Sequence, residues 1–224
     1  MSELLIIRHG ESQGNTGVTL NLDTSLTENG MVQVCRTGIW IYNNLKLDGY
    51  IGYVSPYMRT LQTASNLSEI TGVEFTVEES IREFRFIKNS DVIVPNRSLE
   101  FQNIYWPRQW LDYSEKVYSN ESVEDFIDRS MNFILGLHPD GKYMIVTHGS
   151  PFAMLCKVTV GKSRIELEEE CRKTTELLQP QNAKKFLDAT PTEQALFFGG
   201  IKNCALSLLL ENQPVFYNRV VYED

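Results

Sequence analysis

The sequence predicts an α/β protein built around a largely parallel sheet, and two observations lead to this fold class. Short, continuously apolar runs recur along the chain, a pattern typical of strands that are buried on both faces. Stretches with helical periodicity separate these runs, and such alternation favours parallel strands covered by helices. The length of 224 residues is consistent with one domain over residues 1–224 that carries an insertion.

Capping residues mark the predicted helices in the first half of the chain. Thr27 opens a periodic stretch that continues to about Asn44. Ser55, which a proline follows, predicts a second helix with this serine as its N-cap, and Gly72 marks the end of that helix. The strands that we expect in this half are the apolar runs 4–7 and 51–54, together with residues 73–77.

The second half of the chain continues the alternation after an irregular stretch. We expect an insertion between about residues 87 and 121, because this stretch lacks a regular period. The aromatic residues within 101–110 form either a satellite core under a long loop or a lid that touches a ligand. Ser122 then opens a helix with a capping box. Further helices are expected over 151–158 and 163–178, and strands over 143–147, 205–210 and 215–221.

The charge balance and the lengths of the apolar runs narrow the range of partners. With 21 Lys and Arg against 29 Asp and Glu, the net charge is −8, whereas proteins that bind nucleic acids usually carry the opposite balance. No run approaches the roughly 18 apolar residues of a membrane span. Four scattered cysteines without a secretory segment indicate a reducing compartment. We therefore expect a cytoplasmic protein that binds neither nucleic acid nor membrane.

Two histidines lie where two predicted strands end. His9 and His148 each follow an apolar run, and each precedes a glycine, which lets the backbone approach a ligand closely. Ligands of open α/β sheets bind beyond the carboxyl ends of the strands. Arg8 precedes the first histidine, and Arg59 lies in the first turn of the helix after strand 51–54. Two imidazoles and two guanidinium groups can therefore converge on a site that suits a phosphate.

Such a site performs catalysis if one histidine attacks phosphorus. A neutral imidazole is a nucleophile when a hydrogen bond holds the proton on its other nitrogen. A carboxylic acid must then protonate the leaving oxygen and later activate water. Glu83, which follows the third predicted strand and has arginines on both sides, is the best candidate for this acid. The alternatives nearby are Glu11, Glu78 and Glu79.

Two other interpretations of the histidines remain open from the residues alone. His9 and His148 could be structural, each satisfied by hydrogen bonds within the core. They could also bind zinc together with a carboxylate, but no spacing typical of zinc ligands, such as H-E-x-x-H, occurs in the chain. We therefore expect no metal ligands. The third histidine, His138, lies in a predicted turn.

Short motifs occur in a characteristic order along nearly the whole chain. They are Arg8-His9-Gly10-Glu11, Asn15, residues 26–30, residues 55–64, Glu83, Glu121-Ser122, Thr147-His148-Gly149 and Asn203-Cys204. A lone Arg-His-Gly tripeptide would be weak evidence, because short matches are common, but the ordered set is specific. The set resembles the histidine phosphatase superfamily, the phosphoglycerate-mutase-like proteins.

The resemblance implies a fold, a mechanism and roles for six residues. The fold would be a three-layer α/β/α sandwich around a mostly parallel sheet. His9 would become phosphohistidine and Glu83 would donate the proton, in a reaction that needs neither a metal nor another cofactor. The residues that would hold the phosphoryl group are Arg8, Asn15, Arg59 and His148. From the residues alone, Asn15 could instead serve only its own turn.

The segment after Glu83 favours hydrolysis over phosphoryl transfer to a second hydroxyl. The chain continues Phe84-Arg85-Phe86-Ile87-Lys88 and has no Gly-x-x-Glu-Gly, the acidic motif usual in mutases and small-sugar phosphatases of this family. We therefore expect a metal-independent phosphatase that acts on a small phosphorylated ester, with a phosphoprotein as the other substrate class. The alternatives are transfer of the phosphoglycerate mutase type and a non-catalytic module that binds a phosphorylated ligand.

Overall fold

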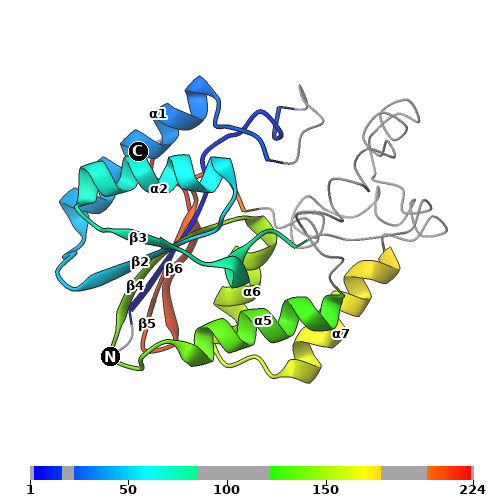
Figure 1. Ribbon diagram of the computed structural model, residues 1–224. Coiled ribbons are helices and arrows are strands. Elements are labelled where there is room, and N and C mark those ends of the chain that lie inside the picture. Colours follow the sequence, from blue (N-terminus) through cyan, green and yellow to red (C-terminus); the bar gives the residue numbers. More distant parts are fainter. Residues whose placement is uncertain (1–2, 17–22, 85–121, 178–200, 223–224) are drawn as a thin grey trace, which may run out of the picture. The chain divides into compact units, whose positions relative to one another are not determined.

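The computed structural model describes residues 3–16, 23–84, 122–177 and 201–222 (Figure 1). The expected insertion between about residues 87 and 121, with its aromatic residues, lies outside this described part and stays a prediction. The chain divides into two compact units. The first comprises Met1–Glu83, Arg129–Lys162 and Ile201–Asp224, and the second comprises Phe84–Asp128 and Ser163–Gly200.

A six-stranded sheet in the order β3-β2-β4-β1-β5-β6 forms the centre of the first unit. The strands β3, β2, β4 and β1 run parallel to one another, whereas β5 pairs antiparallel with both β1 and β6. This mixed, mostly parallel sheet confirms the predicted fold class. The strands are β1 (Glu3–Arg8), β2 (Tyr50–Val54), β3 (Phe75–Val77), β4 (Lys142–Thr147), β5 (Leu206–Leu210) and β6 (Gln213–Arg219).

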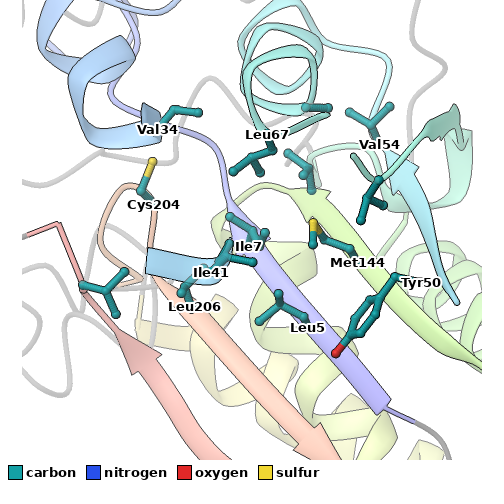
Figure 2. Close-up of a cluster of buried hydrophobic side chains, with 14 of the residues drawn as sticks. Leu5, Ile7, Val34, Ile41, Tyr50, Val54, Leu67, Met144, Cys204 and Leu206 are labelled. Carbon is teal, nitrogen blue, oxygen red and sulfur yellow. The ribbon is translucent and has the colours of Figure 1, made fainter. Parts of the chain in front are cut away.

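Alternate residues of the central strands face two separate layers of helices. Leu5 and Ile7 of β1 belong to a core cluster with residues of α1 (Glu28–Asn44) and α2 (Met58–Thr71), as Figure 2 shows. Their neighbours Leu4 and Ile6 belong to a second cluster, which includes residues of α6 (Gly149–Thr159) and Phe133 of α5 (Val123–Gly136). In Figure 1, α1 and α2 lie on one side of the sheet and α6 on the other. The first unit is therefore a three-layer sandwich.

Local capping explains several helix boundaries. Thr27 is the N-cap of α1, and its hydroxyl accepts a hydrogen bond from the amide of Gly30 at 2.9 Å. Gly72 ends α2 in the left-handed conformation, with a φ of 75° that favours glycine. At the start of α5, the Ser122 hydroxyl and the Asp125 carboxylate each accept from the other residue's amide, which confirms the predicted capping box.

The predicted N-cap of α2 is wrong. The helix begins at Met58, and Ser55 lies three residues before it at the end of β2. The carboxylate of Asp23 accepts a hydrogen bond from the Met58 amide at 2.6 Å and so satisfies a donor of the first turn. The Ser55 hydroxyl instead bonds a histidine that lies far away in the sequence, because the end of the neighbouring strand brings this histidine beside it.

In the second unit, the described residues include α7 (Arg164–Leu177), which agrees with the expected acidic helix over 163–178. Arg164 forms an ion pair with Asp128 at 2.5 Å and another with Glu168, four residues further along, at 2.6 Å. None of the helices among the described residues is long and apolar enough to cross a membrane.

Candidate active site

The carboxyl ends of the parallel strands β1 and β4 bring the two predicted histidines together. The strands are neighbours, and Arg8 lies opposite Thr147 at their carboxyl ends. A histidine follows directly after the last residue of each strand, and the His9 amide donates to the Thr147 carbonyl at 3.0 Å. The rings of His9 and His148 pack edge to face with their centroids 5.2 Å apart.

The hydrogen bonds of His9 determine its tautomer. Its Nδ1 lies 2.7 Å from the carbonyl oxygen of Gly10, which can only accept, so Nδ1 carries the proton. Its Nε2 lies 3.2 Å from Nε of Arg59, which can only donate, so Nε2 presents its lone pair. The side chain is buried, with 2% of its surface exposed. His9 thus has the tautomer that a nucleophile at Nε2 requires.

Arg59 reaches the site from the first turn of α2. Its side chain is buried although it is a charged residue. The guanidinium lies over the ring of Tyr57, 4.7 Å from the centroid, and the same ring packs edge-on against His148 at 4.9 Å. The buried ring of Tyr57 therefore packs against both Arg59 and His148, two of the predicted phosphate-binding residues, and shields them from water.

Arg8 is held by the segment that precedes β5. Its Nη1 donates to the carbonyl of Ile201, and its amide donates to the Ala205 carbonyl at 3.1 Å. Its Nε is buried and has no partner within the described ranges of the chain. A buried guanidinium N–H without a partner suits an anionic ligand that would accept from it.

The same segment contributes a residue that sequence reasoning used only as a motif marker. The side-chain oxygen of Asn203 is buried and lacks a partner among the residues that the structure describes. The next residue, Cys204, has a φ of 52°, and its amide donates to the His9 carbonyl at 3.1 Å. The Asn203-Cys204 motif thus lies directly against the backbone of His9.

Glu83 lies just after a turn that follows β3. The turn contains the short helix η1 (Glu79–Ile81), and the Ile81 carbonyl accepts from the Thr147 hydroxyl at 2.6 Å. Burial lowers the pKa of Arg8, and the Glu83 carboxylate opposes this effect by raising it, so the two side chains interact electrostatically. The structure therefore brings Glu83 within electrostatic reach of the arginine that precedes His9.

Two of the alternative carboxylates are engaged elsewhere. The Glu11 carboxylate accepts from the hydroxyl of Thr27 at 2.7 Å and from the amide group of Asn29 at 3.2 Å. The Glu78 carboxylate accepts from both the amide and the hydroxyl of Ser80. These contacts favour Glu83 as the acid.

The structure places Asn15 in an exposed turn. Its side-chain oxygen accepts from the amide and from the hydroxyl of Ser12, each at 3.0 Å. This is the local turn that the residues alone allowed as an alternative. The contact between Asn15 and a phosphate stays a prediction.

Two glycines allow α1 to pack directly against the backbone that carries His9. A Cβ atom on Gly30 would lie 2.0 Å from the Glu11 carbonyl oxygen, and one on Gly10 would lie 2.7 Å from the Gly30 carbonyl oxygen. Both contacts are with backbone atoms, so a side chain at either position would push the helix away from the site.

Burial keeps both histidines neutral. It lowers the pKa of His9 well below its ordinary value, and the charges of Arg59 and Arg8 lower it further. The pKa of His148 is also lowered well below its ordinary value, by burial first and then by Arg59. Near neutral pH, both rings are therefore uncharged.

These lowered pKa values predict a loss of stability in mild acid. Each histidine has a pKa near 6.5 in the unfolded chain and a lower one in the folded chain, so the unfolded state binds more protons as the pH falls below about 6.5. The stabilisation is complete above this pH and is lost on acidification. We expect each histidine to lower the free energy of unfolding by about 1 kcal/mol between pH 6.5 and 5.5.

Urea unfolding in phosphate-free buffer at both pH values measures this loss. The His9→Asn variant separates the contribution of this histidine from that of the carboxylates, and it should lose about 1 kcal/mol less than the wild type over the same interval. An equal loss in the two proteins would contradict the expected burial of neutral His9.

Within the described ranges of the chain, no three His, Cys, Asp or Glu side chains form a group that could hold a metal ion. The other interpretation of the histidines, a purely structural role, leaves two buried nitrogen atoms unexplained. Arg8 Nε and His148 Nδ1 are both buried without a protein partner in this part of the chain. The Nε–H of Arg8 suits a bound anion, and so does His148 Nδ1 in the tautomer that carries the proton there.

Two curated proteins are similar to this chain. "Putative phosphoserine phosphatase 2" of Hydrogenobacter thermophilus is 28% identical over 71% of this chain and 79% of that protein. The 2,3-bisphosphoglycerate-dependent phosphoglycerate mutase of Pelagibacter ubique is also 28% identical, over 70% of this chain and 80% of the mutase.

Solved structures share the fold. A mycobacterial glucosyl-3-phosphoglycerate phosphatase in complex with VO3 matches with a TM-score of 0.60 at 19% identity, over 96% of this chain and 98% of that one. A phosphoserine phosphatase mutant from Entamoeba histolytica in complex with phosphoserine matches with a TM-score of 0.57 at 18% identity, over 99% of both chains.

The family model of the histidine phosphatase superfamily (branch 1) matches residues 4–177, well over half of the chain. The match includes Arg8, His9, Arg59, Glu83 and His148, the five residues that the structure gathers at the carboxyl edge of the sheet. This chain belongs to the histidine phosphatase superfamily, branch 1.

Proposed function

We propose that the protein is a phosphatase that hydrolyses a phosphomonoester through a phosphohistidine intermediate on His9. The observation that carries the proposal is the tautomer of His9. The Gly10 carbonyl holds the proton on Nδ1, and the neutral Nε2 lone pair meets the guanidinium of Arg59. A phosphoryl group bound to the same guanidinium would lie next to the nucleophile.

The first step forms a bond between Nε2 of His9 and phosphorus. The bond between phosphorus and the ester oxygen breaks, and the acid form of Glu83 gives its proton to this leaving oxygen, so an alcohol departs. The imidazole ring becomes more positive as it is phosphorylated. The Gly10 carbonyl, which accepts from Nδ1, stabilises this charge.

The second step returns the enzyme to its starting state. Glu83, now a carboxylate, takes a proton from water while the water oxygen attacks phosphorus. The phosphorus–nitrogen bond breaks, inorganic phosphate leaves, and His9 is neutral again. The protons and charges balance over the two steps without any further reactant.

The charge on the transferred phosphoryl group must be stabilised during both steps. Arg8 and Arg59 supply two fixed positive charges, and His148 and Asn15 would add neutral donors. Arginine groups of this kind do the electrostatic work that a divalent metal does in other phosphatases, so we expect turnover to persist in the presence of a chelator.

Phosphoglycerate-mutase-type transfer is the second candidate, because one of the similar curated proteins is a mutase. The segment after Glu83 lacks the acidic Gly-x-x-Glu-Gly motif, and this favours hydrolysis. Small phosphorylated metabolites are the first substrates to test, since phosphoserine is the ligand of one structural relative. A phosphopeptide panel tests the other substrate class, and a phosphoglycerate assay primed with a bisphosphorylated ester tests the mutase.

Trapping the intermediate tests the proposed mechanism. We expect the wild type, quenched in alkali during turnover of an aryl phosphate in chelator, to gain the mass of one phosphoryl group on the peptide that contains His9. Phosphate on histidine survives alkali but is lost in acid, so an acid-treated half of the same sample is the matched control. Turnover without this labelled peptide, or turnover that stops in chelator, would contradict the mechanism.

A further inference from the structure

The hydroxyl of Ser55 is buried beside the second histidine of the site. None of its surface is exposed, and its Oγ lies 2.7 Å from Nε2 of His148. The backbone of Ser55 is held on both sides: its amide donates to Val146 at 3.1 Å, and its carbonyl accepts from the Thr60 hydroxyl at 2.8 Å. The hydroxyl is therefore fixed in position next to the imidazole.

The hydrogen-bonding capacities of the two groups determine which one donates. Within the described part of the chain, the Ser55 hydroxyl makes its hydrogen bond with His148 alone. A buried hydroxyl that donates elsewhere would need another acceptor, so its proton points to Nε2. Nε2 then carries a lone pair, and the single proton of the neutral ring resides on Nδ1.

The opposite tautomer would leave more groups unsatisfied. If Nε2 donated to Ser55, the hydroxyl proton and the Nδ1 lone pair would both be buried without partners. With the proton on Nδ1, one donor lacks a partner in the described protein, namely the Nδ1–H of His148. A phosphoryl oxygen would satisfy this donor, whereas the lone pair of the other tautomer would repel it.

We propose that Ser55 is a positioning residue that holds His148 in the tautomer whose Nδ1–H donates to the phosphoryl group of the substrate. This inference rests on the proposed function, because it concerns the phosphoryl site of that reaction. It explains why a serine that resembles a helix cap in the sequence is used instead to bind the ring of a distant histidine.

A neutral His148 makes the choice of tautomer important. A doubly protonated ring would present a donor from either nitrogen, but burial and the charge of Arg59 lower the pKa of His148 and keep the ring neutral. Only one of its nitrogens can therefore donate. Without the Ser55 hydroxyl, nothing described at Nε2 would favour the productive form.

Nitrogen NMR of the histidine rings tests the inference without any substrate. The chain has three histidines, so spectra of His9→Asn and His138→Asn variants assign the His148 signals by elimination. In the wild type, we expect Nδ1 to be protonated and Nε2 to be unprotonated. In Ser55→Ala, we expect both tautomers to be populated. Ser55→Thr, which keeps the hydroxyl, should restore the wild-type pattern.

Binding of inorganic phosphate and turnover test the consequence of the tautomer. We expect Ser55→Ala to weaken phosphate binding about tenfold and to lower kcat more than it raises KM, because the lost donor acts mainly on the charge of the transition state. Ser207→Ala is the matched control. Ser207 is an equally buried serine of β5 that accepts from the Asn218 amide, so its loss should leave both quantities unchanged.

Failure of this inference is distinct from failure of the proposed function. A protonated Nε2 in the wild type overturns the inference even if His9 is phosphorylated during turnover. An unchanged tautomer and unchanged phosphate affinity in Ser55→Ala also overturn it. If no phosphohistidine forms in the wild type, the proposed function fails, and the NMR and phosphate-binding results still decide the role of Ser55.

Discussion

Replacing His9 with asparagine is expected to lower kcat/KM for a phosphomonoester by about 10³-fold or more. The variant lacks the Nε2 lone pair that would attack phosphorus, and no second nucleophile would take its place. Asparagine is smaller than histidine and polar, so it keeps a hydrogen-bonding group near the Gly10 carbonyl. Steady-state hydrolysis of an aryl phosphate measures the effect.

His138→Asn is the matched control for this prediction. His138 is exposed, and its Nδ1 accepts from the Asp140 amide in the turn before β4. Asparagine favours such turns, so both folding and turnover should remain as in the wild type. If His9→Asn retained more than a tenth of the wild-type activity while His138→Asn was unaffected, the nucleophilic role of His9 would be wrong.

Replacing Glu83 with glutamine is expected to have an effect that depends on the leaving group. An alkyl phosphate needs a proton on its leaving oxygen, so loss of the acid should lower kcat by about 10²- to 10³-fold. An aryl phosphate with an acidic phenol as leaving group departs as an anion, so its first step should change little. Single-turnover release of the leaving group from both kinds of ester measures this difference.

Glu79→Gln provides the control at a neighbouring carboxylate. Glu79 is exposed on η1, four residues before Glu83, and the change preserves its size. We expect no dependence on the leaving group in this variant. An equal loss of single-turnover rate for alkyl and aryl esters in Glu83→Gln would show that Glu83 acts on binding and not as the proton donor.

The amount of phosphoenzyme that accumulates in Glu83→Gln provides a second test of the role of this residue. The same residue activates the water in the proposed second step, so the variant should accumulate phosphohistidine after a burst of phenol release. Mass spectrometry of the alkali-quenched protein measures the phosphorylated fraction. A burst without accumulation would place the water-activating role on another group.

Local features of the sequence were sufficient to predict many of the helices and strands. Thr27 as an N-cap and a helix from there to Asn44 agree with α1 as observed, because capping and apolar periodicity act over a few residues. The apolar runs agree with the strands β1, β2 and β4 to within one residue at each end. These local patterns predict the elements without any information on which elements lie next to them in the fold.

The strand ends also led to the candidate residues of the site. Arg8, His9 and His148 were expected to meet because parallel strands end at one edge of a sheet, and β1 and β4 are indeed neighbours. The position of Arg59 followed from its place in the first turn of a helix after a strand. Chemical type and strand position were therefore enough to propose a phosphate site.

The sequence by itself determined most of the helices and strands and four of the residues that meet at the site, namely Arg8, His9, Arg59 and His148, since these depend on local pattern and on strand ends. The tertiary structure alone decided the tautomer of His9, the approach of Glu83 to Arg8 and the contact between Ser55 and His148. The contacts of His9 with Arg59, of Glu83 with Arg8 and of Ser55 with His148 all join residues that lie far apart in the sequence. Ser55 was expected to cap a helix because its local pattern fits a cap, but the neighbouring strand β4 supplies a buried imidazole that only the folded chain brings within reach.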